Sequence, residues 1–300
     1  MTSKHRLPLT VLELNAPSAD KVLSFLQGQI SCQLSPETPE KASRGAFCDR
    51  FGRVVSDAVL VPPGHQLTPN SSWLLVVRQD IWPLLETFLT PYARLSRVAW
   101  TLPAQSISVS YAADLTNMSY LDTRRNPDDS SLDICLDTAM KNATQSNWGV
   151  RLAPSDSSAQ DSDTGAMHQQ DQVLRQAAIQ AKAPFMLPET SGKFTPHELN
   201  YHETNLVHFN KGCYLGQEVI ARMQHLGKLK KHFQVLQMPE FELAAGDRLK
   251  LASGNQSITV IDSLPLTKGM QLVAACTPDR AIDNGYVLLA DQIQAQLVTL

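Results

Sequence analysis

Residues Lys211–Glu218 read KGCYLGQE, so that Gly212 and Gly216 lie on either side of a single cysteine, Cys213. Glycines at these positions permit a tight turn and allow a partner to approach the backbone closely. The segment is therefore our first candidate for a functional loop.

The residues that follow, Gln217–Leu226, have the spacing of a short helix, with Glu218 and Arg222 one turn apart and Gly227 as a stop signal. Cys213 would then lie just before a helix N-terminus and near cationic side chains, a setting that favours a reactive thiolate. The alternative is that Cys213 is a small buried hydrophobe, which is common for free cysteines.

The length and composition of the chain limit the possible fold classes. A chain of 300 residues with 43% hydrophobic residues is long enough for about two globular domains. Its cysteines are odd in number, scattered and never in a C-x-x-C pair, which excludes a disulfide framework and a zinc ribbon. The five cysteines are Cys32, Cys48, Cys135, Cys213 and Cys276.

Charge and hydropathy favour a cytoplasmic protein. The formal net charge is −3, but residues Lys211–His232 carry a local excess of four positive charges, which leaves one basic edge on an acidic body. No apolar run approaches the ~18 residues that span a bilayer. The N-terminal segment is interrupted by Pro8 and Glu13, so it makes a poor secretion signal. We expect no membrane partner.

Strand-like and helix-like segments in the first half of the chain predict an α+β fold with hairpins. The predicted strands are Leu9–Leu14, Arg44–Cys48, Val54–Val61 and Trp73–Val77, and the predicted helices are Ser18–Ile30 and Asp80–Leu89.

The second half begins with a polar segment, residues 153–171, which contains four aspartates and no lysine or arginine and predicts a variable acidic loop. A helix is expected over Gln172–Lys182. From Lys231 onward, five short strands at regular spacing predict a small barrel. They are His232–Met238, Asp247–Leu251, Ser257–Leu264, Gln271–Cys276 and Gly285–Leu289.

The KGCYLGQE segment, followed by Ala221-Arg222, resembles the signature of the YgfZ family, folate-binding iron–sulfur cluster maturation factors that are related to the glycine cleavage T-protein. The resemblance extends to three further stretches, outside the middle of the chain. These are Phe25–Gln29 (FLQGQ), Cys48–Arg53 (CDRFGR) and Gly192–Asn200 (GKFTPHELN), with Phe209-Asn210 leading into the signature.

The resemblance implies an α+β fold like that of the aminomethyltransferases. It predicts a folate-binding body of two similar halves around a central cavity, residues 1–230, and a small C-terminal β-barrel, residues 231–300. The implied function is that of a monomeric, cytoplasmic accessory factor for the assembly or repair of iron–sulfur clusters in 4Fe–4S enzymes, including enzymes that modify tRNA. The implied partners are these client enzymes or assembly proteins.

The resemblance also implies where the chemistry occurs. The family's signature cysteine corresponds to Cys213, and we expect Lys211 and Arg222 to act with it, around a transient contact with an iron–sulfur cluster. We expect cofactor contacts from the other residues of the segment, namely Gly212, Tyr214, Gly216, Gln217 and Glu218. The implied cofactor is tetrahydrofolate or a related folate.

The sequence departs from the family pattern at two positions that are expected to contact folate. Some bacterial relatives hold folate against two aromatic side chains, whereas this chain has Val11 or Leu12 and Leu174 at the corresponding positions. Any stacking on the pterin would have to come from other residues, so we expect weaker binding.

Two other functions stay open: a folate-dependent aminomethyltransferase, which the signature cysteine disfavours, and an RNA-binding accessory protein that uses the basic edge. Direct RNA binding has little support, because only Tyr214 and Phe233 lie among the five cations of that edge.

A metal site is not expected. His197 and His202 are five residues apart, whereas a zinc-protease helix needs a spacing of four. A Cys213–histidine hydrolase pair is conceivable from sequence proximity alone, but proximity in sequence gives no geometry.

Overall fold

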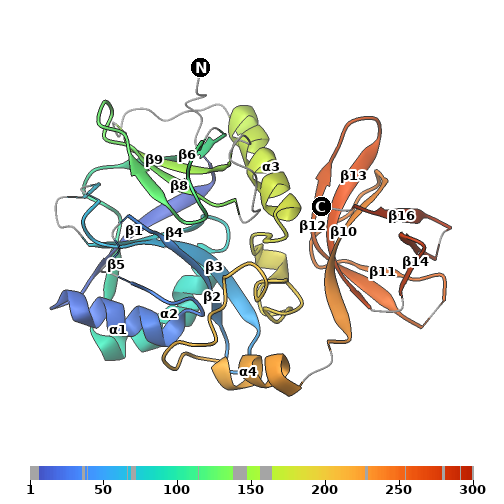
Figure 1. Cartoon of the computed structure of the whole chain (residues 1–300), viewed down its shortest axis with the longest axis horizontal. Helices are drawn as coiled ribbons and strands as arrows, with labels where there is room; N and C mark the ends of the chain where they lie inside the picture. The colour runs from blue at the N-terminus through green and yellow to red at the C-terminus, as the bar shows by residue number, and fades with distance from the viewer. Residues whose placement is uncertain are drawn as a thin grey trace.

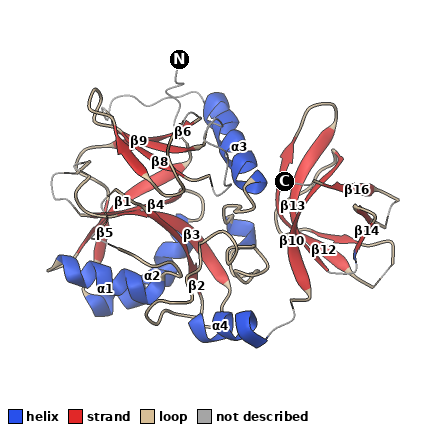
Figure 2. Cartoon of the chain, viewed as in Figure 1, coloured by secondary structure: helices blue, strands red, loops and turns tan. Residues whose placement is uncertain are grey.

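The structure is a computed structural model, and it describes residues 7–35, 38, 40–65, 67–68, 72–113, 115–137, 147–155, 164–226, 229–253, 255–278, 281–290 and 292–298. Within these ranges the chain forms three antiparallel sheets with helices around them (Figures 1 and 2). The α+β class predicted from the sequence is confirmed. None of the helices in these ranges combines the length and the apolar character that a bilayer crossing requires.

The first sheet has five strands and is covered on both faces. Its strand order is β2 (Ser43–Cys48), β3 (Val54–Val61), β4 (Trp73–Arg78), β1 (Leu9–Asn15) and β5 (Ala99–Thr101). In β4 every residue is buried, because alternate side chains enter two different cores. Trp73 and Leu75 pack toward helices α1 (Ala19–Gln29) and α2 (Trp82–Ser96), whereas Leu74 and Val76 pack toward the second sheet.

The second sheet has four strands, in the order β6 (Ile107–Ala112), β9 (Gly149–Pro154), β8 (Leu132–Cys135) and β7 (Thr123–Arg125). It shares one apolar core with the first sheet and with helix α3 (Thr164–Gln180). The two sheets of the body are therefore unequal in size, with five and four strands.

The predicted acidic loop over residues 153–171 is wrong at both of its ends, because residues 153–154 belong to β9 and residues 164–171 belong to a helix. Helix α3 begins at Thr164, eight residues before the expected start, while residues 156–163 lie outside the described ranges. Asp171 in this helix is buried, and its Oδ1 atom lies 2.6 Å from Nη1 of Arg78 in β4. A partner 93 residues away in sequence offsets the cost of burying the carboxylate.

The C-terminal segment forms a seven-stranded sheet that curls into a half-barrel (Figure 1). All five predicted strands are present, within one or two residues at each end. Their observed bounds are β10 (Lys231–Pro239), β11 (Arg248–Lys250), β12 (Ser257–Pro265), β13 (Met270–Pro278) and β15 (Tyr286–Leu288). The structure adds β14 (Ile282–Asp283) and β16 (Gln294–Leu297), and a bridge between Leu251 and Leu289 brings the two ends of the sheet together.

An ion pair joins this sheet to the body. The guanidinium of Arg175 in α3 contacts the buried carboxylate of Asp262 in β12. Between α3 and the half-barrel the chain runs through turns and one short 3-10 helix, η1 (Pro188–Thr190), before it reaches α4 (Gln217–Leu226). The bounds of α4 match the prediction, and its expected stop signal, Gly227, lies outside the described residues.

Candidate functional site

The segment Lys211–Gly216, which we call the cysteine loop, lies where the similar stretches of the sequence meet. The backbone N–H of Leu215 donates a hydrogen bond of 3.1 Å to the carbonyl of Gly28 at the end of α1. On the other side, Gly216 packs against the β2–β3 turn at Asp49 and Gly52. The fold therefore brings FLQGQ and CDRFGR into contact with the signature.

Lys211 fixes one end of this loop. Its ammonium donates to three carbonyl oxygens, those of Gln27 at 3.0 Å, Ile30 at 2.6 Å and Cys32 at 2.8 Å. It also lies 5.0 Å from the centre of the Tyr214 ring. Because a lysine ammonium has three donors, these contacts use its full hydrogen-bonding capacity. Burial lowers the pKa of Lys211 to about 8. Lys211 thus acts in the structure as a positioning residue.

Gly216 fixes the other end. Its φ of 83° lies in the left-handed region, and a Cβ atom there would lie 2.4 Å from the carbonyl oxygen of Asp49. The turn that it packs against is itself ordered, since Oδ1 of Asp49 accepts hydrogen bonds of 2.9 Å from the N–H groups of Phe51 and Arg53. Gly212 has open space around its Cα and no comparable constraint.

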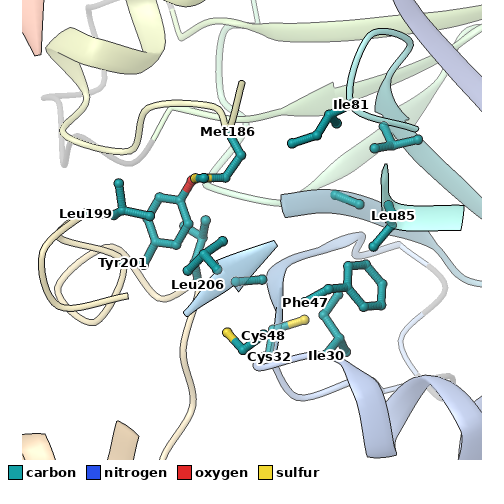
Figure 3. Close-up of a cluster of buried hydrophobic side chains, with 14 of the residues drawn as sticks. Ile30, Cys32, Phe47, Cys48, Ile81, Leu85, Met186, Leu199, Tyr201 and Leu206 are labelled. Carbon is teal, nitrogen blue, oxygen red and sulfur yellow. The ribbon is translucent and has the colours of Figure 1, made fainter. Parts of the chain in front are cut away.

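Cys213 is the one exposed cysteine among the five, all of which the structure describes. Burial raises the pKa of Cys32 and of Cys276 to about 12 and that of Cys48 still further. Figure 3 shows Cys32 and Cys48 within the apolar core beside Phe47 and Ile30. The buried-hydrophobe alternative for Cys213 is therefore wrong, and a thiol that solvent can reach precedes the start of α4 by four residues.

The other residues expected at the site divide into two groups. Tyr214 is buried, and its N–H donates to Oε1 of Gln217 at 3.3 Å, so both serve the loop itself. Glu218 and Arg222 face solvent and form an exposed ion pair of 2.8 Å along α4. Of the expected contact residues beyond Cys213, these two side chains can reach a partner without rearrangement.

The β2–β3 turn adds a feature that the sequence analysis missed. The side chain of Phe51 is 59% exposed, and the guanidinium of Arg50 lies 4.7 Å from the centre of its ring. The turn residues next to Gly52 were the available signal, but nothing in the sequence shows that this turn lies against the cysteine loop.

A pair of histidines lies next to α4. The rings of His197 and His202 have their centres 4.7 Å apart, and Nε2 of His197 lies 3.0 Å from Oε1 of Gln224 in α4. Burial lowers the pKa of both histidines, and His197 and His232 further lower that of His202. No group of three metal-ligating side chains occurs in the described ranges.

The residues at the expected folate position do not fit a pterin in this conformation. Val11 and Leu174 are buried in the core between the two sheets of the body, and Leu12 is buried on the opposite face of β1. A void in the core between the two sheets, lined by residues such as Val76 and Phe185, measures about 10 Å³, which is the room of a single water molecule.

Asp57, the acidic residue at this void, is already paired. Its Oδ2 atom accepts two hydrogen bonds from Arg44, and its Oδ1 atom accepts one from the N–H of Met186. Both carboxylate oxygens of Asp57 are therefore engaged by hydrogen bonds from the protein itself.

Comparison with known proteins places these features in context. No protein-family model matches the chain. It is 24% identical to the tRNA-modifying protein YgfZ of Klebsiella pneumoniae over 294 residues and 25% identical to that of Escherichia coli over 298 residues. Each match covers 91% of this chain and 86% of the relative. A local match of 48 residues to the YgfZ of Colwellia psychrerythraea reaches 52% identity but spans 15% of that protein.

Among solved structures, the chain is similar to aminomethyltransferase T of the glycine cleavage system from Bartonella henselae, with a TM-score of 0.57. The match covers 97% of this chain and 83% of the other at 10% identity, so it shows the shared fold alone.

Proposed function

Since the chain has homologues of the YgfZ family along 91% of its length, we propose that it assists the assembly or repair of iron–sulfur clusters in 4Fe–4S enzymes that modify tRNA. The observation that carries the proposal is the exposed thiol of Cys213 on a loop anchored at both ends. The name of the homologues, tRNA-modifying protein, agrees with such clients.

In this proposal the cluster is cargo. One thiolate cannot complete a site that needs four ligands, so Cys213 supplies a single contact and the remaining ligands come from the client or from a small thiol. Lys211 and Gly216 hold the loop in place, while Glu218 and Arg222 offer charged side chains beside it. A fixed loop lowers the conformational entropy lost when the thiol meets its target.

Replacing Cys213 with serine tests this role. We expect Cys213→Ser to fold normally, with a melting temperature within a degree or two of the parent, because the side chain is exposed and the hydroxyl stays hydrated. In cells that lack the endogenous protein, the variant should fail to restore the activity of 4Fe–4S enzymes and the modification of tRNA.

The matched control is Cys276→Ser, a buried cysteine in β13. The new hydroxyl loses its hydration on folding, so we expect the free energy of unfolding of this variant to fall by roughly 1–3 kcal/mol. The fraction of the variant that folds should still support complementation. Full complementation by Cys213→Ser would refute the thiol role. Equal loss of stability in both variants would show that Cys213 is structural.

For folate we propose weak binding at the void beside Asp57, because the body must open before a pterin can enter. Titration calorimetry with tetrahydrofolate should give a dissociation constant far above the micromolar range. Leu174→Tyr, which adds an aromatic ring at an expected stacking position, is the informative comparison: tighter binding by this variant would support the location. Micromolar affinity of the parent chain would show that the void opens readily, which contradicts our expectation.

A further inference from the structure

A second surface, apart from the thiol of Cys213, has the properties of a binding site. Helix α1 and the C-terminal end of α2 enclose a groove of about 320 Å³. Its lining includes Lys21, Phe25 and Gln29 from α1 and Leu95 and Arg97 from the end of α2. This volume is at the lower end of the range found for ligand sites.

The groove is lined by two cationic side chains, those of Lys21 and Arg97. No acidic residue lines it, and the side chains of Lys21 and Arg97 make no ion pair with any residue in the described ranges. Arg97 ends α2 in a left-handed conformation, with φ of 55°, where a glycine would serve the backbone equally well. Two positive charges therefore face the groove without a partner from this part of the chain.

The same groove offers apolar contact. The side chain of Leu95 is 85% exposed, the highest value among the large hydrophobic residues that the structure leaves at the surface. An occupant should thus carry negative charge and an apolar group.

We propose that this groove docks an acidic peptide segment with one large apolar side chain, contributed by a partner protein. Carboxylates complement Lys21 and Arg97, and the apolar side chain covers Leu95. Inorganic phosphate would satisfy only the two cations. The charge complementarity and the exposed leucine together favour a peptide over a small anion.

The groove lies next to the residues that hold the cysteine loop. The groove includes Gly28, whose carbonyl accepts the hydrogen bond from Leu215, and Lys211 binds the carbonyls of Gln27 and Ile30 at the same end of α1. A partner seated there lies against the helix end that carries the cysteine loop. The inference goes beyond the proposed function and does not depend on the chemistry of the thiol.

Fluorescence anisotropy with a fluorescein-labelled peptide of sequence DDELFEDD tests the proposal. We expect saturable binding that weakens as salt rises. The double variant Lys21→Ala with Arg97→Gly should weaken it by about tenfold, the sum of two exposed ion pairs. Leu95→Ser should weaken it by a similar factor. Lys250→Ala, which removes an exposed cation from β11, should leave it unchanged, and so should Cys213→Ser.

Four outcomes would overturn the proposal. The first is equal affinity of the parent and the groove variants. The second is equal binding of a peptide in which serine replaces the leucine and phenylalanine, because the site would then read charge alone. The third is full displacement of the peptide by millimolar inorganic phosphate at constant ionic strength, which would identify an anion site. Loss of binding in Cys213→Ser alone would also contradict the groove as the docking site.

Discussion

Replacing Asp57 with asparagine should lower the free energy of unfolding by about 3–5 kcal/mol, the typical cost of leaving a buried charge without its partner. The carboxylate of Asp57 lies 2.7 Å from Nη2 of Arg44, and the two side chains are 3% and 0% exposed. Asparagine keeps the size and the acceptor for the N–H of Met186, but it leaves the Arg44 guanidinium without a counter-ion. Urea denaturation followed by circular dichroism measures the change.

A matched control comes from the exposed ion pair in α4. Glu218→Gln makes the same chemical change beside Arg222, where both side chains reach water, and should cost at most about 0.5 kcal/mol. The double variant Arg44→Met with Asp57→Asn removes both buried charges and should recover part of the stability lost in Asp57→Asn. A loss below about 1 kcal/mol in Asp57→Asn would show that water reaches Arg44.

This buried pair also supports the site at a distance. Arg44 donates a hydrogen bond of 3.2 Å to the carbonyl of Ala183. The hydroxyl of Tyr201 donates a hydrogen bond of 2.6 Å to the carbonyl of Pro184. The pair therefore fixes the chain segment that leads to Gly192–Asn200. That stretch then pairs with the first sheet through Val54, whose N–H donates to the carbonyl of Phe194 at 2.8 Å.

Local pattern in the sequence accounts for most of the secondary structure. Alternation and helical spacing depend on neighbours within one or two turns, so β3 and α4 were predicted with their observed bounds. Helix α2 runs to Ser96, beyond the expected Leu89, even though Pro91 lies inside it. The first eight residues of helix α3 were missed because they are polar, and the burial of Asp171 depends on Arg78 from another element.

The site is predictable only in part, for a related reason. The identity of Cys213 and its place before a helix follow from residues close in sequence. The position of Lys211 does not, because its three acceptors lie 179 to 184 residues away. As a cation beside a cysteine, Lys211 suggested a role in chemistry, whereas in the folded chain its donors are used to hold the loop. Contacts of such long range leave no periodic signal in a single sequence.

The two glycines of the cysteine loop should respond very differently to the same substitution. In Gly216→Ala the new methyl group would lie 2.4 Å from the carbonyl oxygen of Asp49, a backbone atom that cannot rotate away. The left-handed conformation at φ of 83° adds about 1–2 kcal/mol for a residue with a Cβ atom, and the overlap adds roughly 1–3 kcal/mol. We expect a total loss of about 2–5 kcal/mol, together with displacement of the loop.

Gly212→Ala is the control, because a Cβ atom at this exposed position meets nothing within 4 Å. It should change the stability by less than about 0.5 kcal/mol and leave complementation intact. Denaturation measures the stability of both variants, and the rate at which iodoacetamide alkylates Cys213 reports on the loop itself. We expect the alkylation rate to change in Gly216→Ala and to stay at the parent value in Gly212→Ala. If both variants behaved like the parent, the close contact between the cysteine loop and the β2–β3 turn would be wrong, and the thiol would have no rigid support from that side.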